Sequence, residues 1–297
     1  MNGPRFLDPR VLARIDKLDL LARTVVEGFL SGLHHSPYRG LSTDFAEHRE
    51  YMPGDDIRRI DWRVFGRTDR FYVKEFEADT NANFTVLLDV SSSMDYGSEG
   101  VTKLDYARYL AASLAYLARR QRDRVGIVTF AGDVLEVVPA SAKHLEIVLH
   151  VIDRVRPAGA GSLGRSLSRI AEIVRRRSIV ALISDLYDEP EAVVDAVAPL
   201  VYRGTDVIVL HVLDRAEREF PFAEAAPFED LETGIRMPVV PETLASDYRE
   251  VMAGHVETLG RVLGERGVDY WMTDTSTPLD FTLFEYLNRR ARLARVR

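Results

Sequence analysis

The sequence predicts an α/β protein with a doubly wound, mostly parallel sheet and helices on both of its faces. Two observations support this fold class. From residue 83 onward, short segments rich in apolar and β-branched residues alternate with longer segments whose apolar residues recur at helical spacing. The segment 84–89 is apolar at most positions, which is typical of a buried central strand. Strands that alternate with helices are expected to lie parallel, joined by right-handed crossovers.

The individual elements follow from this alternation. The expected strands cover residues 84–89, 124–130, 179–183, 206–213 and 268–273, and residues 134–138 are expected to form a short hairpin with the second strand. The expected helices cover residues 104–120, 144–155, 163–176, 191–202, 242–266 and 279–295. Residues 220–240 are irregular and contain prolines, and they are predicted to form a β-hairpin excursion.

Residues 1–80 are predicted to be an N-terminal part distinct from an α/β domain at residues 81–297. One amphipathic helix is expected over residues 11–30, because apolar residues recur there at helical spacing and an aspartate and a proline precede them. Gly32 is expected to end this helix. Residues 71–76 are rich in aromatic and β-branched residues, so they predict a strand in a small β-rich extension.

The composition narrows the classes of function. The chain has 297 residues, no cysteine and a formal net charge of −7. Without cysteine there is no disulfide framework, thiolate metal site or cysteine nucleophile. The negative charge argues against a general nucleic-acid binder, which needs a basic surface. The apolar runs are far shorter than the ~18 residues that span a bilayer, and the N-terminus lacks the apolar core of a signal peptide. We therefore expect a soluble, cytoplasmic protein without a membrane span.

Polar residues follow two of the predicted strands at their carboxyl ends. Asp89, Ser91 and Ser93 follow the first strand, and Asp185 follows the third. The loop at residues 159–162 is expected to join them, because ligands bind in the crevice beyond the carboxyl ends of the strands. Carboxylates and hydroxyls are hard oxygen ligands, which suit Mg²⁺ or a similar small cation. The sequence therefore predicts a cation site in this crevice. In the alternative interpretation, the serines only cap the turn and the following helix.

The chain lacks the motifs of several enzyme classes. It contains no G-x-S-x-G nucleophile elbow, no G-x-x-x-x-G-K-[ST] phosphate loop and no H-E-x-x-H zinc motif. A haloacid-dehalogenase-like phosphatase needs a second acid two residues after Asp89, where Ser91 stands. We therefore expect no enzymatic activity, with a metal-dependent phosphoesterase as the weaker alternative. His211, inside a strand, is expected to be a core histidine rather than a metal ligand.

Residues 49–70 form a second candidate surface. Six arginines are interleaved there with aspartate and glutamate. Charges balanced in this way usually form mutual ion pairs, whereas arginine is also the residue that binds anionic groups with two hydrogen bonds. Both interpretations stay open, and Arg58, Asp61 and Arg67 are the candidate partner-binding residues.

The crevice residues resemble a known type of metal site. Asp89, Ser91 and Ser93 match the D-x-S-x-S motif of the metal-ion-dependent adhesion site in von Willebrand factor A-type domains. Asp185 matches that family's aspartate after the fourth strand. The resemblance implies a von Willebrand factor A-like fold and a bound Mg²⁺, or Mn²⁺ or Ca²⁺ in its place.

One part of the adhesion motif does not match. The family carries a threonine in a G-G-T loop, and Gly161 stands at the corresponding position of this chain. Ser162 follows one residue later. Either Ser162 supplies the hydroxyl after a local shift, or the site has lost one direct ligand.

The segment before the first strand resembles the bacterial family called domain of unknown function 58. Residues 49–62 read REYMPGDDIRRIDW and are followed by Gly66, Arg67 and Thr68. That family's pattern is R-x-Y-x-P-G-D-D-x-R-x-I-D-W-x-x-x-A-R-T. The resemblance implies a cytoplasmic protein that works beside a MoxR-type AAA+ ATPase in the assembly or maturation of complexes.

The metal site and the resemblance together predict a function. A divalent ion held by one or two carboxylates and neutral hydroxyls keeps positive charge and an open position, which an aspartate or glutamate of a partner can fill. We therefore expect a non-enzymatic, metal-dependent protein–protein interaction module. The alternative is a structural adaptor that docks through residues 49–70 and carries a vestigial metal loop.

Overall fold

The computed structural model describes residues 8–15, 17–35, 48–50, 70–74, 82–159 and 162–296. Its centre is a six-stranded sheet with the strand order β10-β7-β6-β3-β4-β5. The strands are parallel except for the edge strand β5, which is antiparallel to β4. This sheet confirms the predicted fold class. Its strands are β3 (Asn83–Asp89), β4 (Arg124–Phe130), β5 (Val134–Ser141), β6 (Ile179–Ser184), β7 (Asp206–Leu213) and β10 (Asp269–Asp274).

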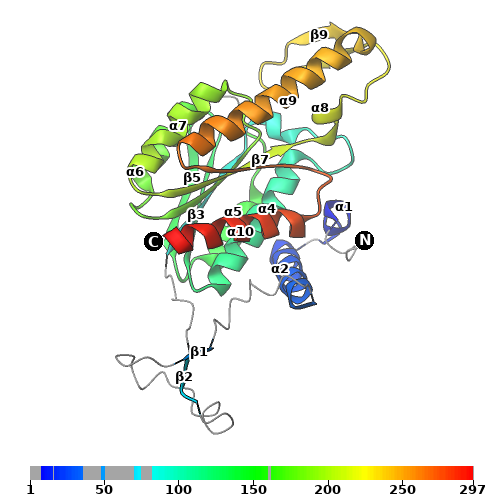
Figure 1. The fold of residues 1–297 in the computed structure, drawn as a ribbon. Helices are drawn as coiled ribbons and strands as arrows, with labels where there is room; N and C mark the ends of the chain where they lie inside the picture. The colour runs from blue at the N-terminus through cyan, green and yellow to red at the C-terminus, as the bar shows by residue number, and fades with distance from the viewer. Residues whose placement is uncertain are drawn as a thin grey trace.

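Helices cover both faces of the sheet (Figure 1). They are α1 (Pro9–Leu12), α2 (Leu18–His35), the 3-10 helix η3 (Ser92–Asp95), α4 (Lys103–Arg120), α5 (Leu145–Arg154), α6 (Leu163–Ile173), α7 (Pro190–Tyr202), α8 (Arg215–Glu219), α9 (Pro241–Glu265) and α10 (Leu279–Val296). Two antiparallel pairs complete the described strands: β1 (His48–Glu50) with β2 (Tyr72–Lys74), and β8 (Ala226–Glu229) with β9 (Arg236–Val239). The second pair confirms the hairpin excursion predicted before α9.

Each face of the sheet buries its own apolar core. Side chains of α2, α4, α5 and α10 pack on one face, and those of α6, α7 and α9 pack on the other. Along β6, Ala181 and Ile183 belong to the first core, whereas Val180 and Leu182 belong to the second. A strand buried on both faces must be apolar at successive positions, which explains the continuous apolar runs in the sequence.

The N-terminal helix differs from the prediction. A single helix over residues 11–30 is wrong, because α1 ends at Leu12 and α2 begins at Leu18. Both leucines are buried, yet a continuous helix would place them about 120° apart around its axis. The turn between the two helices lets both side chains reach the core. The predicted end at Gly32 is also wrong, since α2 continues to His35.

Helix α2 packs against α4, α5 and α10 and contributes to the core of the sheet. The predicted boundary between residues 1–80 and 81–297 lies outside the described residues and stays a prediction.

Helix α6 ends at Ile173 rather than at residue 176, because Val174 is extended, with φ −68° and ψ 134°.

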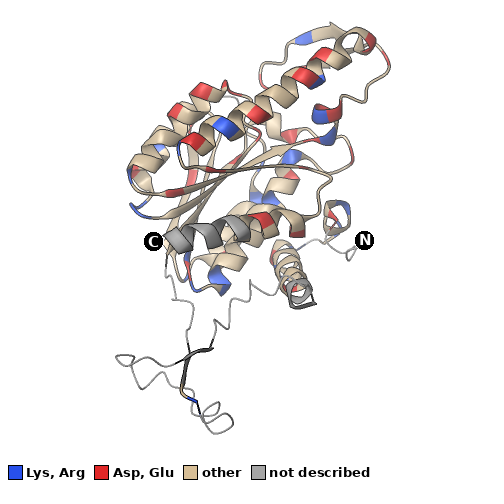
Figure 2. Cartoon of the chain, in the orientation of Figure 1, with Lys and Arg blue, Asp and Glu red and all other residues tan. Residues whose placement is uncertain are grey.

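Charged residues of both signs are interspersed on the helices around the sheet (Figure 2). Arg23 and Glu27 on α2, and Arg261 and Glu265 on α9, form ion pairs one helical turn apart. Such pairs are typical of solvated helix faces. In the part of the chain that the structure describes, no helix combines the length and the apolarity needed to cross a membrane.

Candidate metal centre at the carboxyl end of the sheet

The candidate site lies where β3 ends. The backbone N–H of Val90 donates to the carbonyl oxygen of Phe130 at 2.8 Å, and the N–H of Ala158 donates to the carbonyl oxygen of Val90 at 2.7 Å. Two residues after Val90, Ser92 donates its N–H to the carbonyl oxygen of Gly159 at 2.9 Å. These bonds join the loops after β3, β4 and α5 at the carboxyl edge of the sheet, where a doubly wound fold places its ligands.

Asp89 is the last residue of β3, and only 6% of its surface is exposed. Its Oδ1 atom accepts a hydrogen bond from the backbone N–H of Ser91 at 2.9 Å. Its Oδ2 atom accepts one from the hydroxyl of Ser184, the last residue of β6, at 2.6 Å. The carboxylate is therefore fixed between the ends of two neighbouring strands.

Ser91 and Ser93 place two hydroxyls in the same cavity as Asp89. Their Oγ atoms lie 3.0 Å apart. Ser91 occupies the N-cap position of η3, but its side chain makes no capping hydrogen bond there. The alternative interpretation, in which this serine serves only as a helix cap, therefore gains no support from the geometry.

Asp185 follows β6 and is held by a buried lysine. The Nζ atom of Lys103 donates to Oδ2 of Asp185 at 2.8 Å and to Oε1 of Glu217 at 2.7 Å, and it lies 4.6 Å from the centre of the Tyr187 ring. Lys103 is 0% exposed, so the two carboxylates neutralise its charge inside the protein. Burial by itself lowers the pKa of Lys103, but the attraction of Asp185 and Glu217 raises it above the ordinary value.

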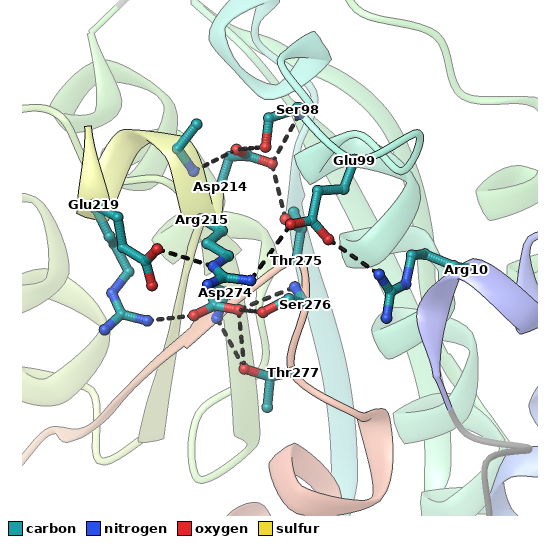
Figure 3. A network of polar contacts seen from close by, with 12 residues as sticks. Arg10, Ser98, Glu99, Asp214, Arg215, Glu219, Asp274, Thr275, Ser276 and Thr277 are labelled. Carbon is teal, nitrogen blue, oxygen red and sulfur yellow. Dashed lines mark hydrogen bonds and ion pairs between the residues drawn. The ribbon is translucent and has the colours of Figure 1, made fainter. Parts of the chain in front are cut away.

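Glu217 is positioned by the first turn of α8. The sequence D-R-A-E at residues 214–217 forms a capping box, in which the backbone N–H of Asp214 donates to Oε2 of Glu217 at 2.8 Å. Asp214 in turn accepts hydrogen bonds from the N–H of Ser98 at 3.1 Å and from the hydroxyl of Thr275 at 2.8 Å. Figure 3 shows how this network ties α8 to the loops after η3 and β10. The capping box therefore fixes one oxygen of Glu217, while the other accepts from Lys103.

The backbone turns sharply after Asp185. Leu186 is buried and has a φ of 48°, a left-handed conformation that leucine rarely adopts. Its N–H donates to the hydroxyl of Ser184 at 3.2 Å, and its carbonyl oxygen accepts from Nε2 of His255 at 2.9 Å. Strained backbone of this kind concentrates at functional sites, and here it directly follows a candidate ligand.

A cavity of about 490 Å³ opens beside these groups. One part of its lining is aromatic and joins the end of α8, the β8–β9 hairpin and α9. The rings pack on one another with centroids 4.7 to 5.7 Å apart; they belong to Phe220, Phe222, Phe228 and Tyr248. The cavity therefore offers apolar surface beside the polar groups at the strand ends.

The charged part of the lining has one sign. Seven acidic residues line the cavity, and no lysine, arginine or histidine is among the described residues that do so. The acids are Asp89, Asp185, Asp188, Glu217, Glu229, Asp230 and Glu232. A cavity lined by charges of one sign attracts the opposite charge, so this one favours a cation.

Burial and the neighbouring Asp185 carboxylate disfavour the negative charge of Asp89. The pKa of Asp89 is raised to about 7, mainly by burial and secondly by the Asp185 carboxylate. The hydrogen bonds from Ser184 and Ser91 act in the opposite direction. A bound cation would offset the repulsion between these two buried carboxylates and would favour their charged forms.

The residues present fit a divalent metal ion. Asp89 and Asp185 offer carboxylates, and Ser91 and Ser93 offer hydroxyls, all of which are hard oxygen ligands. Among the residues that the structure describes, no three His, Cys, Asp or Glu side chains form a metal-ligand group. A metal ion at this site would therefore rely on the serine hydroxyls as well as on the two carboxylates.

The structure brings four of the five predicted ligands to one cavity, namely Asp89, Ser91, Ser93 and Asp185. Ser162 is the exposed N-cap residue of α6 and is not among the described lining residues. Gly161 lies outside the described residues, so the choice between a shifted hydroxyl and a lost ligand stays open. Arg58, Asp61 and Arg67 also lie outside them, and their partner-binding role stays a prediction.

Sequence reasoning misses Lys103 and Glu217. The predicted helix begins at residue 104, one residue too late, and so omits the lysine. Lys103 lies four residues before Ala107, on the face of α4 that faces the core, and a lysine in that apolar stripe is the signal that could identify it. For Glu217 the signal is the D-x-x-E spacing of the capping box.

His211 is a core residue, as predicted. It lies in β7 and is fully buried, with Nδ1 at 2.7 Å from the hydroxyl of Tyr270. Burial lowers its pKa to about 3, and the neighbouring His255 contributes in the same direction. His211 is therefore neutral at ordinary pH.

The chain is similar to mycobacterial proteins over nearly its whole length. It is 28% identical over 297 residues to "Uncharacterized protein Rv1480" of Mycobacterium tuberculosis and to "Uncharacterized protein Mb1516" of Mycobacterium bovis. Each similarity covers 97% of this chain and 92% of the relative. The names of these relatives state no function.

Solved structures similar to this chain are more distant. BatB from Bacteroides thetaiotaomicron is 18% identical, with a TM-score of 0.46, over 71% of this chain and 98% of that one. The SpRpn10 VWA domain is 10% identical, with a TM-score of 0.40, over 67% of this chain and 92% of that one. These similarities are too weak to support a conclusion about function.

The family match covers the site and the segment before it. The family described as "Protein of unknown function DUF58" matches residues 47–275. This range includes the arginine-rich segment 49–70, the loop after β3 and both carboxylates that hold Lys103. Because the match covers most of the chain, the protein belongs to the DUF58 family.

Proposed function

We propose that this chain is a non-enzymatic protein–protein interaction module that binds its partner through Mg²⁺, or through Mn²⁺ or Ca²⁺ in its place. One observation carries the proposal: Asp89, Ser91, Ser93 and Asp185 line a single cavity at the carboxyl end of the sheet. When bound, the metal ion supplies positive charge and an open coordination position. The residues of this chain hold it through carboxylate and hydroxyl oxygens.

The proposed partner supplies an aspartate or a glutamate. Because the charged residues of the described lining are acidic, an acidic side chain is repelled unless a cation is bound first. Metal dependence is therefore expected to be strict. On the resemblance carried by residues 49–68, we propose a MoxR-type AAA+ ATPase as the partner and complex assembly or maturation in the cytoplasm as the setting.

The test is a binding measurement between purified proteins. The full chain is mixed with a MoxR-type ATPase encoded in the same genome, and the affinity is measured in Mg²⁺ and in EDTA. We expect EDTA and Asp89→Ala each to weaken binding about ten-fold or more, because either change leaves the acidic partner without its cation. Asp95→Ala is the matched control, since Asp95 is exposed in the same loop and is not among the described lining residues.

Three other outcomes would replace the proposal. Binding that survives both EDTA and Asp89→Ala would remove the metal dependence. Binding that is insensitive to EDTA but lost in Arg58→Ala or Asp61→Ala would identify the structural adaptor instead. Turnover of phosphoesters in Mg²⁺ or Mn²⁺ that disappears in Asp89→Ala would identify a phosphoesterase.

A further inference from the structure

Lys103 is a fixed monovalent cation at the edge of the candidate metal centre. Its ammonium is fully buried and shared between Asp185 at 2.8 Å and Glu217 at 2.7 Å. A lysine is almost never fully buried unless it is paired, and here both of its acidic partners line the cavity. Lys103 therefore neutralises part of the negative charge of Asp185 and Glu217, which would otherwise attract a metal ion.

The ammonium acts against a divalent ion in two ways. It already takes one oxygen of Asp185, which is one of the two carboxylates in the predicted ligand set. It also adds a positive charge close to the ion, and repulsion between like charges is strong where water is largely excluded. Both effects lower the affinity of the site for metal.

Glu217 acts in the opposite direction. It shares the ammonium with Asp185 and adds a negative charge to the cavity lining. Its second oxygen is fixed by the N–H of Asp214 at 2.8 Å, so it cannot swing away from the lysine without breaking the capping box. Without its negative charge, the ammonium would be left to Asp185 alone, and the cavity would be less acidic.

We propose that Lys103 sets the metal affinity of this site, keeping the ion weakly held until a partner's carboxylate adds a ligand and a negative charge. The inference rests on the proposed function and concerns the same site. Metal binding and partner binding are then cooperative, because each supplies what the other lacks: the ion offers an open position, and the carboxylate offsets the charge of Lys103.

The experiment titrates Mn²⁺ into full-length protein by calorimetry, in the absence of a partner. We expect Lys103→Met to bind Mn²⁺ about ten-fold or more tightly than the wild type, because Asp185 is freed and the repulsion is removed. Glu217→Gln is expected to bind Mn²⁺ more weakly than the wild type. Lys143→Met removes an exposed lysine and is the control, with unchanged affinity.

A second readout covers the stability of the lysine variant. Lys103→Met leaves two partly or fully buried carboxylates without their cation, which destabilises the fold in the absence of metal. Mn²⁺ should therefore raise the melting temperature of this variant by more than it raises that of the wild type. Glu217→Gln keeps Lys103 paired with Asp185. It tests the same inference, because its affinity for Mn²⁺ is expected to fall where that of Lys103→Met is expected to rise.

The outcomes separate this inference from the proposed function. Equal Mn²⁺ affinity in the wild type, Lys103→Met and Glu217→Gln would overturn the role of Lys103 and leave the metal-dependent module standing. No Mn²⁺ binding by any of the proteins would overturn both. Mn²⁺ binding by Lys103→Met alone would support the inference and show that the lysine keeps the isolated wild-type site closed.

Discussion

Ser184, at the end of β6, stabilises the negative charge of Asp89, at the end of the neighbouring strand β3. Its hydroxyl donates to Oδ2 of Asp89 at 2.6 Å and accepts from the N–H of Leu186 at 3.2 Å. In Ser184→Ala, Asp89 loses a donor that lowers its pKa, so it carries less negative charge near neutral pH. We expect the affinity for Mn²⁺, measured by calorimetry at pH 7, to fall about ten-fold, as when other outer-shell partners are removed.

Ser178→Ala is the matched control for this prediction. Ser178 is also buried and precedes the same strand, but its hydroxyl donates to the carbonyl oxygen of Arg175 at 2.5 Å, at the amino end of β6. Its loss should lower stability without changing the affinity for Mn²⁺. An equal loss of affinity in the two variants would mean that Ser184 acts only through general stability.

The site could be predicted where its residues follow one another along the chain. Asp89, Ser91 and Ser93 are spaced so that one turn brings them together, and Asp185 could be added because parallel strands end at the same edge of a sheet. Lys103 could not be placed in this way. Its two acidic partners lie 82 and 114 residues away in sequence, and no local spacing encodes those contacts.

Tyr106 joins three elements, α4, β10 and α10, through its buried hydroxyl. Its hydroxyl on α4 lies 3.1 Å from that of Thr273 on β10 and 3.0 Å from that of Thr282 on α10. At pH 7, Tyr106→Phe is expected to lower the free energy of unfolding by about 1 kcal/mol, the net value of a buried hydrogen bond. Urea unfolding followed by circular dichroism measures this difference.

The same variant tests how the stability of the fold depends on pH. The pKa of Tyr106 is raised from 10.0 to about 12, chiefly by burial, so the folded protein favours the neutral phenol. The unfolded chain releases this proton first, and the stabilisation is therefore complete below pH 10 and is lost as the pH rises to 12. Tyr106→Phe should remove this part of the alkaline loss of stability. Tyr202→Phe, at a site that is 79% exposed, should leave the profile unchanged.

At the scale of elements, the periodicity of apolar residues predicts the six strands of the sheet but does not predict the break between α1 and α2. The six strands of the sheet appear in the apolar pattern because each is buried on one or both faces. The break between α1 and α2 does not appear, because the apolar spacing of residues 11–30 is also consistent with one helix. In the structure α1 ends at Leu12 and α2 begins at Leu18, and both leucines are buried in the same core.

At the scale of the whole molecule, the N-terminal helix and the sheet share one core. The side chains that α2 buries form one cluster with those of β3, α4 and α10; they are Leu18, Leu21, Ala22, Val25, Val26 and Phe29. An N-terminal part that folds independently would bury such side chains among themselves. We therefore expect α2 to unfold together with the sheet, whatever residues 36–80 contribute.

Two neighbouring leucines of α2 test this expectation. Leu21 is 1% exposed and faces the core, whereas Leu20 is 52% exposed. Leu21→Asp places a carboxylate in an apolar environment and should lower the free energy of unfolding of the whole chain by about 3 kcal/mol or more. Leu20→Asp introduces the same charge into the same helix turn and should cost less than about 1 kcal/mol. Urea unfolding followed by circular dichroism should then give one shifted transition for Leu21→Asp. A separate early transition that leaves the main one in place would mean that α2 is a detachable arm and would support a division of the chain near residue 80.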